Sequence, residues 1–237
     1  MTEIAIAFDV ATLEEALALD DALGRGPELA KVGLELFTSA GPAAVQGLKK
    51  RGRRVFLDLK LHDIPNTVKG AARAAARLGA DLLTVHGMGG EEMIGAAVEG
   101  VSATAGATRV VAVTLLTSLD PADPPVGFER PIRLERIAAE MLVMAERAGA
   151  AGIVCAACDL PGIRERHPAP FYAVTPGIRP AGAPSHDQRR VSSIEEAVRL
   201  GSSLVVLGRA ITAAPDPRVA LEAARAEAQA AAGVARG

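Results

Sequence analysis

Two hydrophobic patterns alternate along this chain: short apolar runs, and stretches whose apolar residues recur every three to four positions. The first pattern is typical of buried strands and the second of amphipathic helices. The runs predict strands over Ile4–Phe8, Ala30–Leu34, Arg54–Leu59, Leu82–His86, Val110–Thr114, Gly152–Val154, Phe171–Val174 and Leu204–Leu207. Helices are predicted over Leu13–Leu23, Pro42–Lys50, Thr67–Leu78, Glu91–Ala103, Leu134–Ala148 and an Ala-rich tail, Val219–Ala230.

Repeated strand–helix pairs indicate parallel strands joined by helices. Eight pairs in 237 residues fit a closed (βα)8 TIM barrel better than an open sheet. An open dinucleotide-binding sheet would more often carry a G-x-G-x-x-G turn after its first strand, and Asp9-Val10-Ala11 is not such a turn. No linker interrupts the pattern, so we expect residues 1–237 to form a single barrel domain.

The composition narrows the classes of partner. The chain is 49% hydrophobic and 23% charged, which is ordinary for a soluble globular protein. A net charge of −2 gives no electrostatic footprint for nucleic acid or for an anionic membrane surface. No apolar run approaches the length of about 18 residues that a membrane span requires. The N-terminus is predicted to be a first strand rather than a signal peptide, and we expect a cytoplasmic protein.

Cys155 and Cys158 form a C-x-x-C pair. A zinc site would need a second pair or histidines at ligand spacing, and the sequence offers neither. A redox pair is one interpretation. The simpler one is that Cys155 is a buried residue at the end of a strand and that Cys158 opens the next helix.

Polar side chains gather at the carboxyl ends of the predicted strands, where barrel active sites lie. They are Asp9, Lys31, Asp58, Lys60, His86, Thr114, Thr117 and Arg209. Asp58 and Lys60 are two residues apart, so an extended strand points both to the same face. Because burying an isolated charge is costly, an adjacent Asp and Lys on an apolar strand are more easily explained by chemistry than by stability.

The segment from Asp58 to Thr67, DLKLHDIPNT, resembles the signature D-x-K-x-x-D-I-P-N-T of the orotidine 5′-phosphate (OMP) decarboxylases. The resemblance spans nearly the whole chain. It includes Phe8-Asp9, Lys31-Val32-Gly33, Leu116-Thr117-Ser118, Thr175-Pro176-Gly177-Ile178-Arg179, Asp187-Gln188 and Gly208-Arg209-Ala210-Ile211. It implies a homodimer that converts OMP, a nucleoside monophosphate, to uridine 5′-monophosphate (UMP) without a metal or other cofactor.

The resemblance also implies roles for individual residues. The catalytic network would be Lys31, Asp58, Lys60 and Asp63, with Lys60 stabilising and protonating the C6 carbanion. Asp63 and Thr67 would serve the site of the neighbouring subunit. The substrate would be held by Asp9 and Lys31 at the ribose, Thr117 and Ser118 at the base, and a set completed by Pro176, Arg179, Gln188, Gly208 and Arg209.

The phosphate is expected at Arg209, which follows the eighth strand and opens a short helix, together with Arg179 and Gln188 from the preceding loop. We expect Gly182–Gln188 to close over it. The Pro-rich loop Ser118–Arg133 has no assigned role. His62 is expected to make structural hydrogen bonds. His86 is expected to support Lys60 or Asp58 without contacting the substrate itself.

Two alternatives remain open. Mg²⁺-dependent sugar-phosphate decarboxylases and aldolases of the same superfamily share the D-x-K-x-x-D core. They typically carry Glu where this chain has Lys31, and they lack the I-P-N-T ending. The other alternative is a non-catalytic phosphate-binding barrel, in which a complete set of buried charges would be an unused cost in stability.

Overall fold

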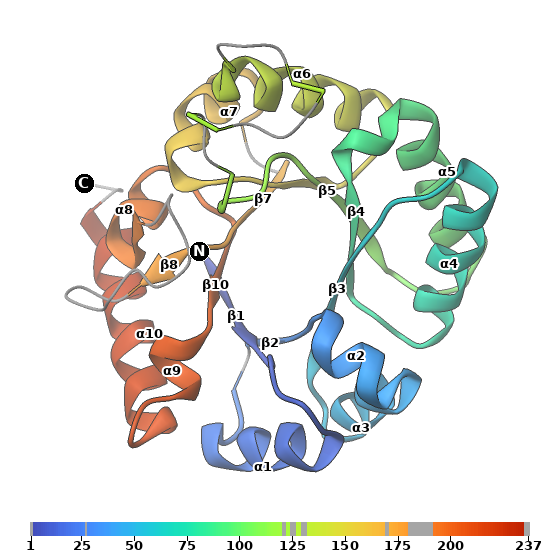
Figure 1. The fold of residues 1–237 in the computed structure, drawn as a ribbon. Coiled ribbons are helices and arrows are strands. Elements are labelled where there is room, and N and C mark those ends of the chain that lie inside the picture. The colour runs from blue at the N-terminus through green and yellow to red at the C-terminus, as the bar shows by residue number, and fades with distance from the viewer. Residues whose placement is uncertain are drawn as a thin grey trace.

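The computed structural model describes residues 2–26, 28–119, 122–123, 127–128, 132–168, 171–179 and 192–234. Eight parallel strands close into a barrel in the order β1-β10-β7-β6-β5-β4-β3-β2 (Figure 1), which confirms the predicted fold class. The strands are β1 (Glu3–Ala7), β2 (Leu29–Val32), β3 (Arg54–Leu61), β4 (Leu82–His86), β5 (Arg109–Val113), β6 (Gly152–Val154), β7 (Tyr172–Thr175) and β10 (Leu204–Leu207). A separate two-stranded sheet pairs β8 (Ile178–Arg179) with β9 (Ser192–Ser193).

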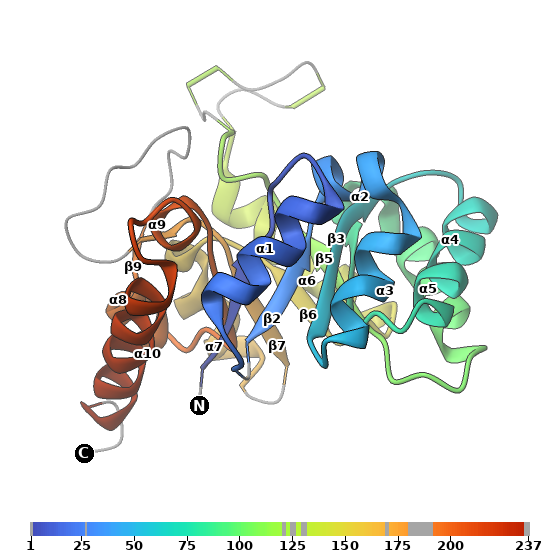
Figure 2. The same ribbon diagram turned by 90° about the horizontal axis from the view of Figure 1, so that it is seen from below.

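Helices surround the barrel, and the side view shows α10 running along its outside (Figure 2). They are α1 (Leu13–Leu23), α2 (Leu34–Ala40), α3 (Pro42–Lys50), α4 (Pro65–Arg77), α5 (Gly90–Ser102), α6 (Leu134–Arg147), α7 (Leu160–Arg166), α8 (Ile194–Arg199), α9 (Arg209–Thr212) and α10 (Pro217–Val234), with 3-10 turns η1 (Gly87–Gly89) and η2 (Ala157–Asp159). No helix in the described ranges has both the length and the apolar character needed to cross a bilayer.

The strand alternation divides the buried residues into two cores. One lies between the strands and the helices, and the other fills the barrel. The barrel core consists of Ala5, Ala7, Leu29, Phe56, Leu82, Val111, Val113, Val154, Tyr172, Val174, Leu204 and Val206. Continuing the same alternation by two residues from Leu29, Phe56 and Leu82 reaches Lys31, Asp58 and Thr84. These three therefore lie above the apolar core, toward the carboxyl ends of the strands.

Polar groups on alternate strands close the amino end of the barrel. Arg54 Nη1 donates a 2.5 Å hydrogen bond to Glu3 Oε1, and the Tyr172 hydroxyl donates to Glu3 Oε2. The Arg109 guanidinium lies 4.1 Å from the centroid of the Tyr172 ring. Burial alone would raise the pKa of Glu3, but the hydrogen bond from Tyr172 and the pairing with Arg54 lower it. This end is a paired structural layer, which leaves the carboxyl end for chemistry.

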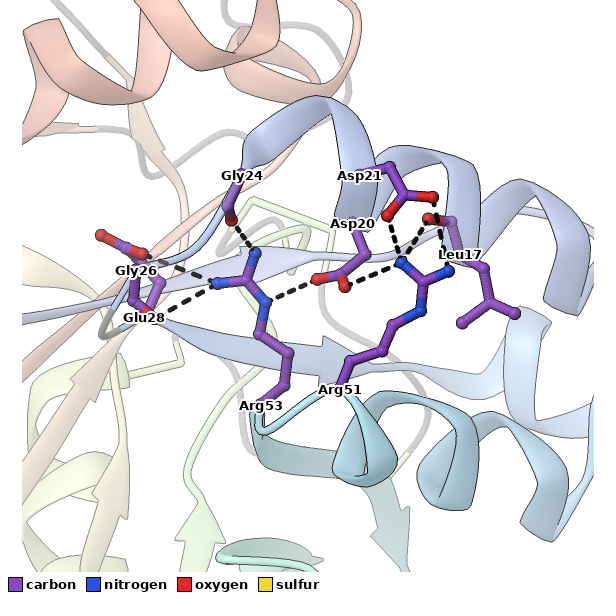
Figure 3. Close-up of polar contacts among 8 residues, drawn as sticks. All are labelled: Leu17, Asp20, Asp21, Gly24, Gly26, Glu28, Arg51 and Arg53. Atoms are coloured by element: carbon purple, nitrogen blue, oxygen red, sulfur yellow. Dashed lines mark hydrogen bonds and ion pairs between the residues drawn. The ribbon is translucent and has the colours of Figure 1, made fainter.

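A largely buried ion-pair network joins α1 to the segments that precede β2 and β3 (Figure 3). Arg53 Nε donates to Asp20 Oδ1 at 2.5 Å, and Arg53 Nη1 donates to the Gly26 carbonyl at 3.3 Å. Arg53 Nη1 also lies 3.9 Å from Glu28 Oε2, and Glu28 pairs with Arg225 of α10. Asp20, Glu28 and Arg53 are all at least nine-tenths buried, so each relies on the others for charge compensation.

Element boundaries differ from the sequence predictions mainly at the carboxyl ends of β2 and β3. Strand β2 was predicted to reach Leu34, but it ends at Val32, and Leu34 begins the unpredicted helix α2. Apolar residues at Leu34 and Leu36 fit a strand, yet only Leu36 is buried, as on a helix. Strand β3 continues to Leu61, two residues beyond the prediction. Helices α7 and α8 were missed because six or seven residues are too few to show a period.

Candidate active site

A cavity of about 260 Å³ opens at the carboxyl ends of the strands. Its deepest wall is apolar, formed by Phe56, Val113, Val154, Val174 and Val206 of the barrel core. Nine of the predicted site residues line it: Asp9, Lys31, Asp58, Lys60, Thr117, Pro176, Arg179, Gly208 and Arg209. The convergence predicted from separate strand ends is therefore present in the folded chain.

Lys31 joins two carboxylates from neighbouring strands. Its Nζ lies 2.9 Å from Asp9 Oδ1 and 3.8 Å from Asp58 Oδ2. The Lys31 side chain is only 10% exposed, so its charge needs these partners. Gly33 leaves room for the pair, because a Cβ there would lie 3.0 Å from Asp9 Oδ1 and 3.1 Å from Lys31 Nζ.

Lys60 and Asp58 form the centre of the charged cluster. Lys60 Nζ donates hydrogen bonds of 2.9 Å to both carboxylate oxygens of Asp58. The Asp58 side chain is 13% exposed and that of Lys60 is 31% exposed. Partial burial strengthens the attraction between the two charges relative to bulk water. The two hydrogen bonds fix the ammonium group beside the apolar wall of the cavity.

The backbone at Lys60 is unusual. Its φ is +48°, the sole positive value at a non-glycine position in the described ranges. The register between β3 and β4 also shifts between Leu57 and Leu61. The Lys60 N–H leaves the sheet ladder and donates instead to Thr84 Oγ1 at 2.8 Å. A left-handed backbone costs roughly 1–2 kcal/mol at an ordinary residue, and such strain tends to be kept at functional sites.

Thr84 was not among the site residues predicted from the sequence. It is fully buried on β4, and its hydroxyl donates a 3.0 Å hydrogen bond to Asp58 Oδ1. The available signal was its position two residues after Leu82, which places a polar side chain on the inward face of an apolar strand. Threonine is common in strands, so that signal did not distinguish it.

Two arginines flank the opposite side of the cavity. Arg209 begins α9 directly after Gly208, as expected, and Arg179 ends β8. Between β7 and β8 the chain turns through Pro176 and Gly177, and the φ of +76° at Gly177 requires glycine. Two guanidinium groups lining one wall make this side suited to an anion. Gln188 and the segment Gly182–Gln188, predicted to join them, lie outside the described residues.

Three predicted site residues do not line the cavity of this chain. Asp63 is exposed, and its Oδ1 accepts a 2.7 Å hydrogen bond from the Ile64 N–H. Thr67 is exposed in the first turn of α4, and Ser118 is exposed in the turn after β5. Within one chain, Asp63 therefore does not complete the network around Lys60.

The histidines near the cluster pack on each other. The rings of His62 and His86 are stacked with centroids 5.4 Å apart, and His86 Nδ1 accepts from the Met88 N–H at 3.2 Å. Burial, followed by the nearby charges of His62 and Lys60, lowers the pKa of His86. The hydrogen bond from β4 to Asp58 comes from Thr84, two residues before His86 in the same strand.

Neither cysteine is in a disulfide; Cys155 is buried and Cys158 is exposed. Cys155 follows β6 and lines the cavity, whereas Cys158 lies in the 3-10 turn η2 rather than at the start of α7. Across the part of the chain that the structure describes, no group of three or more His, Cys, Asp or Glu side chains is arranged as a metal-binding set.

A closed barrel with partly buried lysine–aspartate pairs at the carboxyl ends of its strands is typical of enzymes of the (βα)8 class. The family model described as "Orotidine 5'-phosphate decarboxylase / HUMPS family" matches residues 2–224. The chain belongs to this family.

Individual relatives are similar over nearly their whole lengths. The chain is 48% identical over 232 residues to the orotidine 5'-phosphate decarboxylase of Moorella thermoacetica, covering 95% of this chain and 91% of that protein. It is 47% identical over 228 residues to that of Cutibacterium acnes, covering 95% of each. The crystal structure of orotidine 5'-phosphate decarboxylase from Lactobacillus acidophilus superposes with a TM-score of 0.85 at 35% identity, covering 96% of this chain and 99% of the other.

Proposed function

We infer that this chain decarboxylates OMP to UMP, as a carboxy-lyase. Membership of the family and identities of 42–49% to relatives with that activity support it. The single observation that carries the chemistry is the Lys60 ammonium, held by both oxygens of Asp58 at the edge of the apolar wall. Because a fold alone does not define a reaction, this geometry is what connects the barrel to decarboxylation.

The reaction develops negative charge on one carbon atom of the substrate. When the bond between C6 of the pyrimidine and its carboxylate breaks, CO₂ leaves and the electron pair stays on C6. The ring offers no conjugated sink for that pair, so the protein must stabilise it electrostatically. A fixed ammonium at C6 supplies the opposite charge without solvent reorganisation. Lys60 then donates its proton to C6, which gives UMP, and regains a proton from water.

We propose that Lys31 and Asp9 hold the ribose hydroxyls, while Lys31 also balances the negative charge of Asp58. The Lys31 ammonium contacts both carboxylates, so it supplies the positive charge that a divalent cation would otherwise bring. This arrangement supports metal-independent chemistry over the Mg²⁺-dependent branch of the superfamily.

The remaining cavity residues suit the other parts of a nucleotide. Arg179 and Arg209 lie on one wall, and we propose that they bind the 5′-phosphate together with Gln188. Thr117 lies on the cavity wall that follows β5, where its hydroxyl can contact the base beside Ser118. Pro176 and Gly208 shape the wall between these regions. Phosphate binding remote from C6 provides binding energy that can be used in the transition state.

We also propose a homodimer in which each subunit contributes Asp63 and Thr67 to the other's site. Both side chains are exposed on the rim of the barrel that carries the cavity. Large apolar side chains in the segments that follow β2, β3, β4 and β5 are exposed too: Leu34 is 57% exposed, Ile64 68%, Met88 49% and Leu116 44%. Exposed apolar groups gathered on one rim are typical of a protein interface. A second copy covering this rim would bury them and bring Asp63 toward a neighbouring cavity.

A cytoplasmic location is part of this proposal. Cys155 and Cys158 form no disulfide, which is usual in a reducing compartment. Cys155 lines the cavity, and a reducing compartment would protect its thiol from oxidation, which would add bulk where the substrate binds.

The test is a continuous absorbance assay of OMP loss by the purified chain, with UMP confirmed as the product. We expect turnover without added metal and no loss of rate in EDTA. Turnover that disappears in EDTA and returns with Mg²⁺ would favour the metal-dependent branch. Binding of UMP without any turnover of OMP would favour a non-catalytic phosphate-binding barrel.

A further inference from the structure

We propose that Thr84 is a positioning residue for the decarboxylation, which sets the backbone of Lys60 and the carboxylate of Asp58 through one hydroxyl group. This inference rests on the proposed function, because it concerns how the Lys60 ammonium is held for its reaction at C6. The hydroxyl links the two residues directly: the Lys60 N–H lies 2.8 Å from Thr84 Oγ1, which lies 3.0 Å from Asp58 Oδ1.

The direction of both hydrogen bonds follows from the chemistry of the groups. A backbone N–H can only donate, so Thr84 Oγ1 accepts from Lys60. An ionised carboxylate can only accept, so the single hydroxyl proton of Thr84 goes to Asp58. Thr84 therefore has one fixed hydroxyl orientation, unlike a surface threonine that can rotate between partners.

The accepted hydrogen bond stabilises an unfavourable backbone. At Lys60 the chain departs from the β3–β4 ladder and adopts a φ of +48°, so its N–H would be left without a strand carbonyl. Thr84 Oγ1 replaces that carbonyl from the adjacent strand. This conformation directs where the Lys60 side chain starts, and thus where its ammonium ends.

The donated hydrogen bond completes the support of Asp58. Its carboxylate is contacted from three strands: Lys31 on β2 forms an ion pair with it at 3.8 Å, and Lys60 on β3 and Thr84 on β4 donate hydrogen bonds to it. Both lysines are expected to interact with substrate, so Thr84 is the donor whose contact does not depend on what the cavity holds. Its removal would let the carboxylate rotate and carry the Lys60 ammonium with it.

A purely structural role for Thr84 makes the opposite forecast. If its fully buried side chain only fills the barrel, Thr84→Val keeps the side-chain volume and should keep kcat, whereas Thr84→Ser removes a methyl group, leaves a void and should be the more damaging change. If the hydroxyl positions Lys60 and Asp58, Thr84→Val should instead have the lower kcat. The two substitutions therefore separate positioning from packing.

The experiment measures kcat and KM for OMP in the wild type, Thr84→Val and Thr84→Ser, with thermal melting of each. We expect Thr84→Val to lower kcat on the order of 10- to 100-fold with little change in KM, as for a catalytic group displaced by about 1 Å. Thr84→Ser should restore most of kcat despite its smaller volume. Thr175→Val is the matched control: Thr175 is equally buried and its hydroxyl pairs with Ser202, so that change should alter melting but not kcat.

Wild-type kcat in Thr84→Val, or equal losses in the Val and Ser variants, would overturn the positioning role. If Thr84→Val does not fold, Thr84→Ala against Thr84→Ser makes the same comparison of hydroxyl loss and retention. A wild-type chain that does not turn over OMP would overturn the proposed function and this inference with it. Wild-type turnover alongside a fully active Thr84→Val would overturn the positioning role alone.

Discussion

Lys60 Nζ lies 2.9 Å from each carboxylate oxygen of Asp58, so the ammonium is held at two points before any substrate arrives. In water such a group would have to shed solvent and be oriented during the reaction. Here the orientation is part of the folded state, and the adjoining cavity wall is formed by the apolar side chains of Phe56 and valines. A charge fixed in this way contributes more to the transition state than the same charge free in solution.

The first prediction concerns this ammonium. Lys60→Ala should lower kcat/KM for OMP by at least about 10³-fold, because it removes both the charge at C6 and the proton donor. Circular dichroism and UMP binding should show that the variant remains folded with an accessible cavity. Lys50→Ala, at an exposed position of α3, is the control and should match the wild type. A Lys60→Ala variant with more than a tenth of wild-type kcat/KM would remove Lys60 from the chemistry.

The second prediction tests the shared site. Lys60→Ala and Asp63→Ala dimers should each be inactive, but mixing them should restore activity. A heterodimer has one site with both substitutions and one site in which an intact Lys60 meets an intact Asp63 from the other subunit. At full exchange about half of the dimers are such heterodimers by random pairing, each with one working site, so about a quarter of the wild-type rate is expected.

Subunit exchange must be monitored in the same samples, for example with differently tagged chains. Each variant incubated alone under exchange conditions is the control and should stay inactive. Exchange without any return of activity would show that Asp63 does not act across the interface. Activity of the Asp63→Ala dimer by itself would show that Asp63 is dispensable.

The sequence predicted those parts of the fold and site that depend on local pattern. Alternating apolar runs identified all eight barrel strands, and the spacing of Asp58 and Lys60 placed both at one strand end. Helices α1 and α3 begin and end where their patterns do, since Thr12 caps α1 and Gly41-Pro42 starts α3. These features follow from side-chain periodicity and capping, which neighbouring residues determine.

The parts that were missed depend on contacts between strands. The positive φ of Lys60 and the shifted register of β3 come from an N–H that finds its acceptor on Thr84, 24 residues away. Nothing in the ten-residue motif specifies that partner. Asp63 illustrates a further limit, because its carboxylate does not reach Lys60 within one chain and its assignment came from resemblance alone.

The third prediction concerns the phosphate. Arg209→Ala should lower kcat/KM for OMP by about 10- to 100-fold, the range expected for losing a hydrogen bond to a charged group. Orotidine has no phosphate, so its much slower decarboxylation should change little. Arg199→Ala, exposed on α8, is the control for a general loss of positive charge. Equal losses with OMP and orotidine would show that Arg209 does not bind the phosphate.

The fourth prediction concerns stability, through the network of Figure 3. Arg53→Met keeps much of the side-chain volume but leaves Asp20 and Glu28 buried without their shared cation. Breaking a buried pair in this way costs about 3–5 kcal/mol of unfolding free energy, measurable by urea denaturation. The catalytic cavity lies at the opposite end of the strands, so kcat of the folded variant should stay at the wild-type value.

Arg51→Met is the matched control, because Arg51 also contacts Asp20, at 3.4 Å, but is exposed and pairs mainly with the exposed Asp21. Water can replace an exposed partner, so this change should alter stability little. Equal effects of the two substitutions would mean that burial does not set the strength of this network. A larger effect at Arg53 would show that buried charge stabilises the link from α1 to α10.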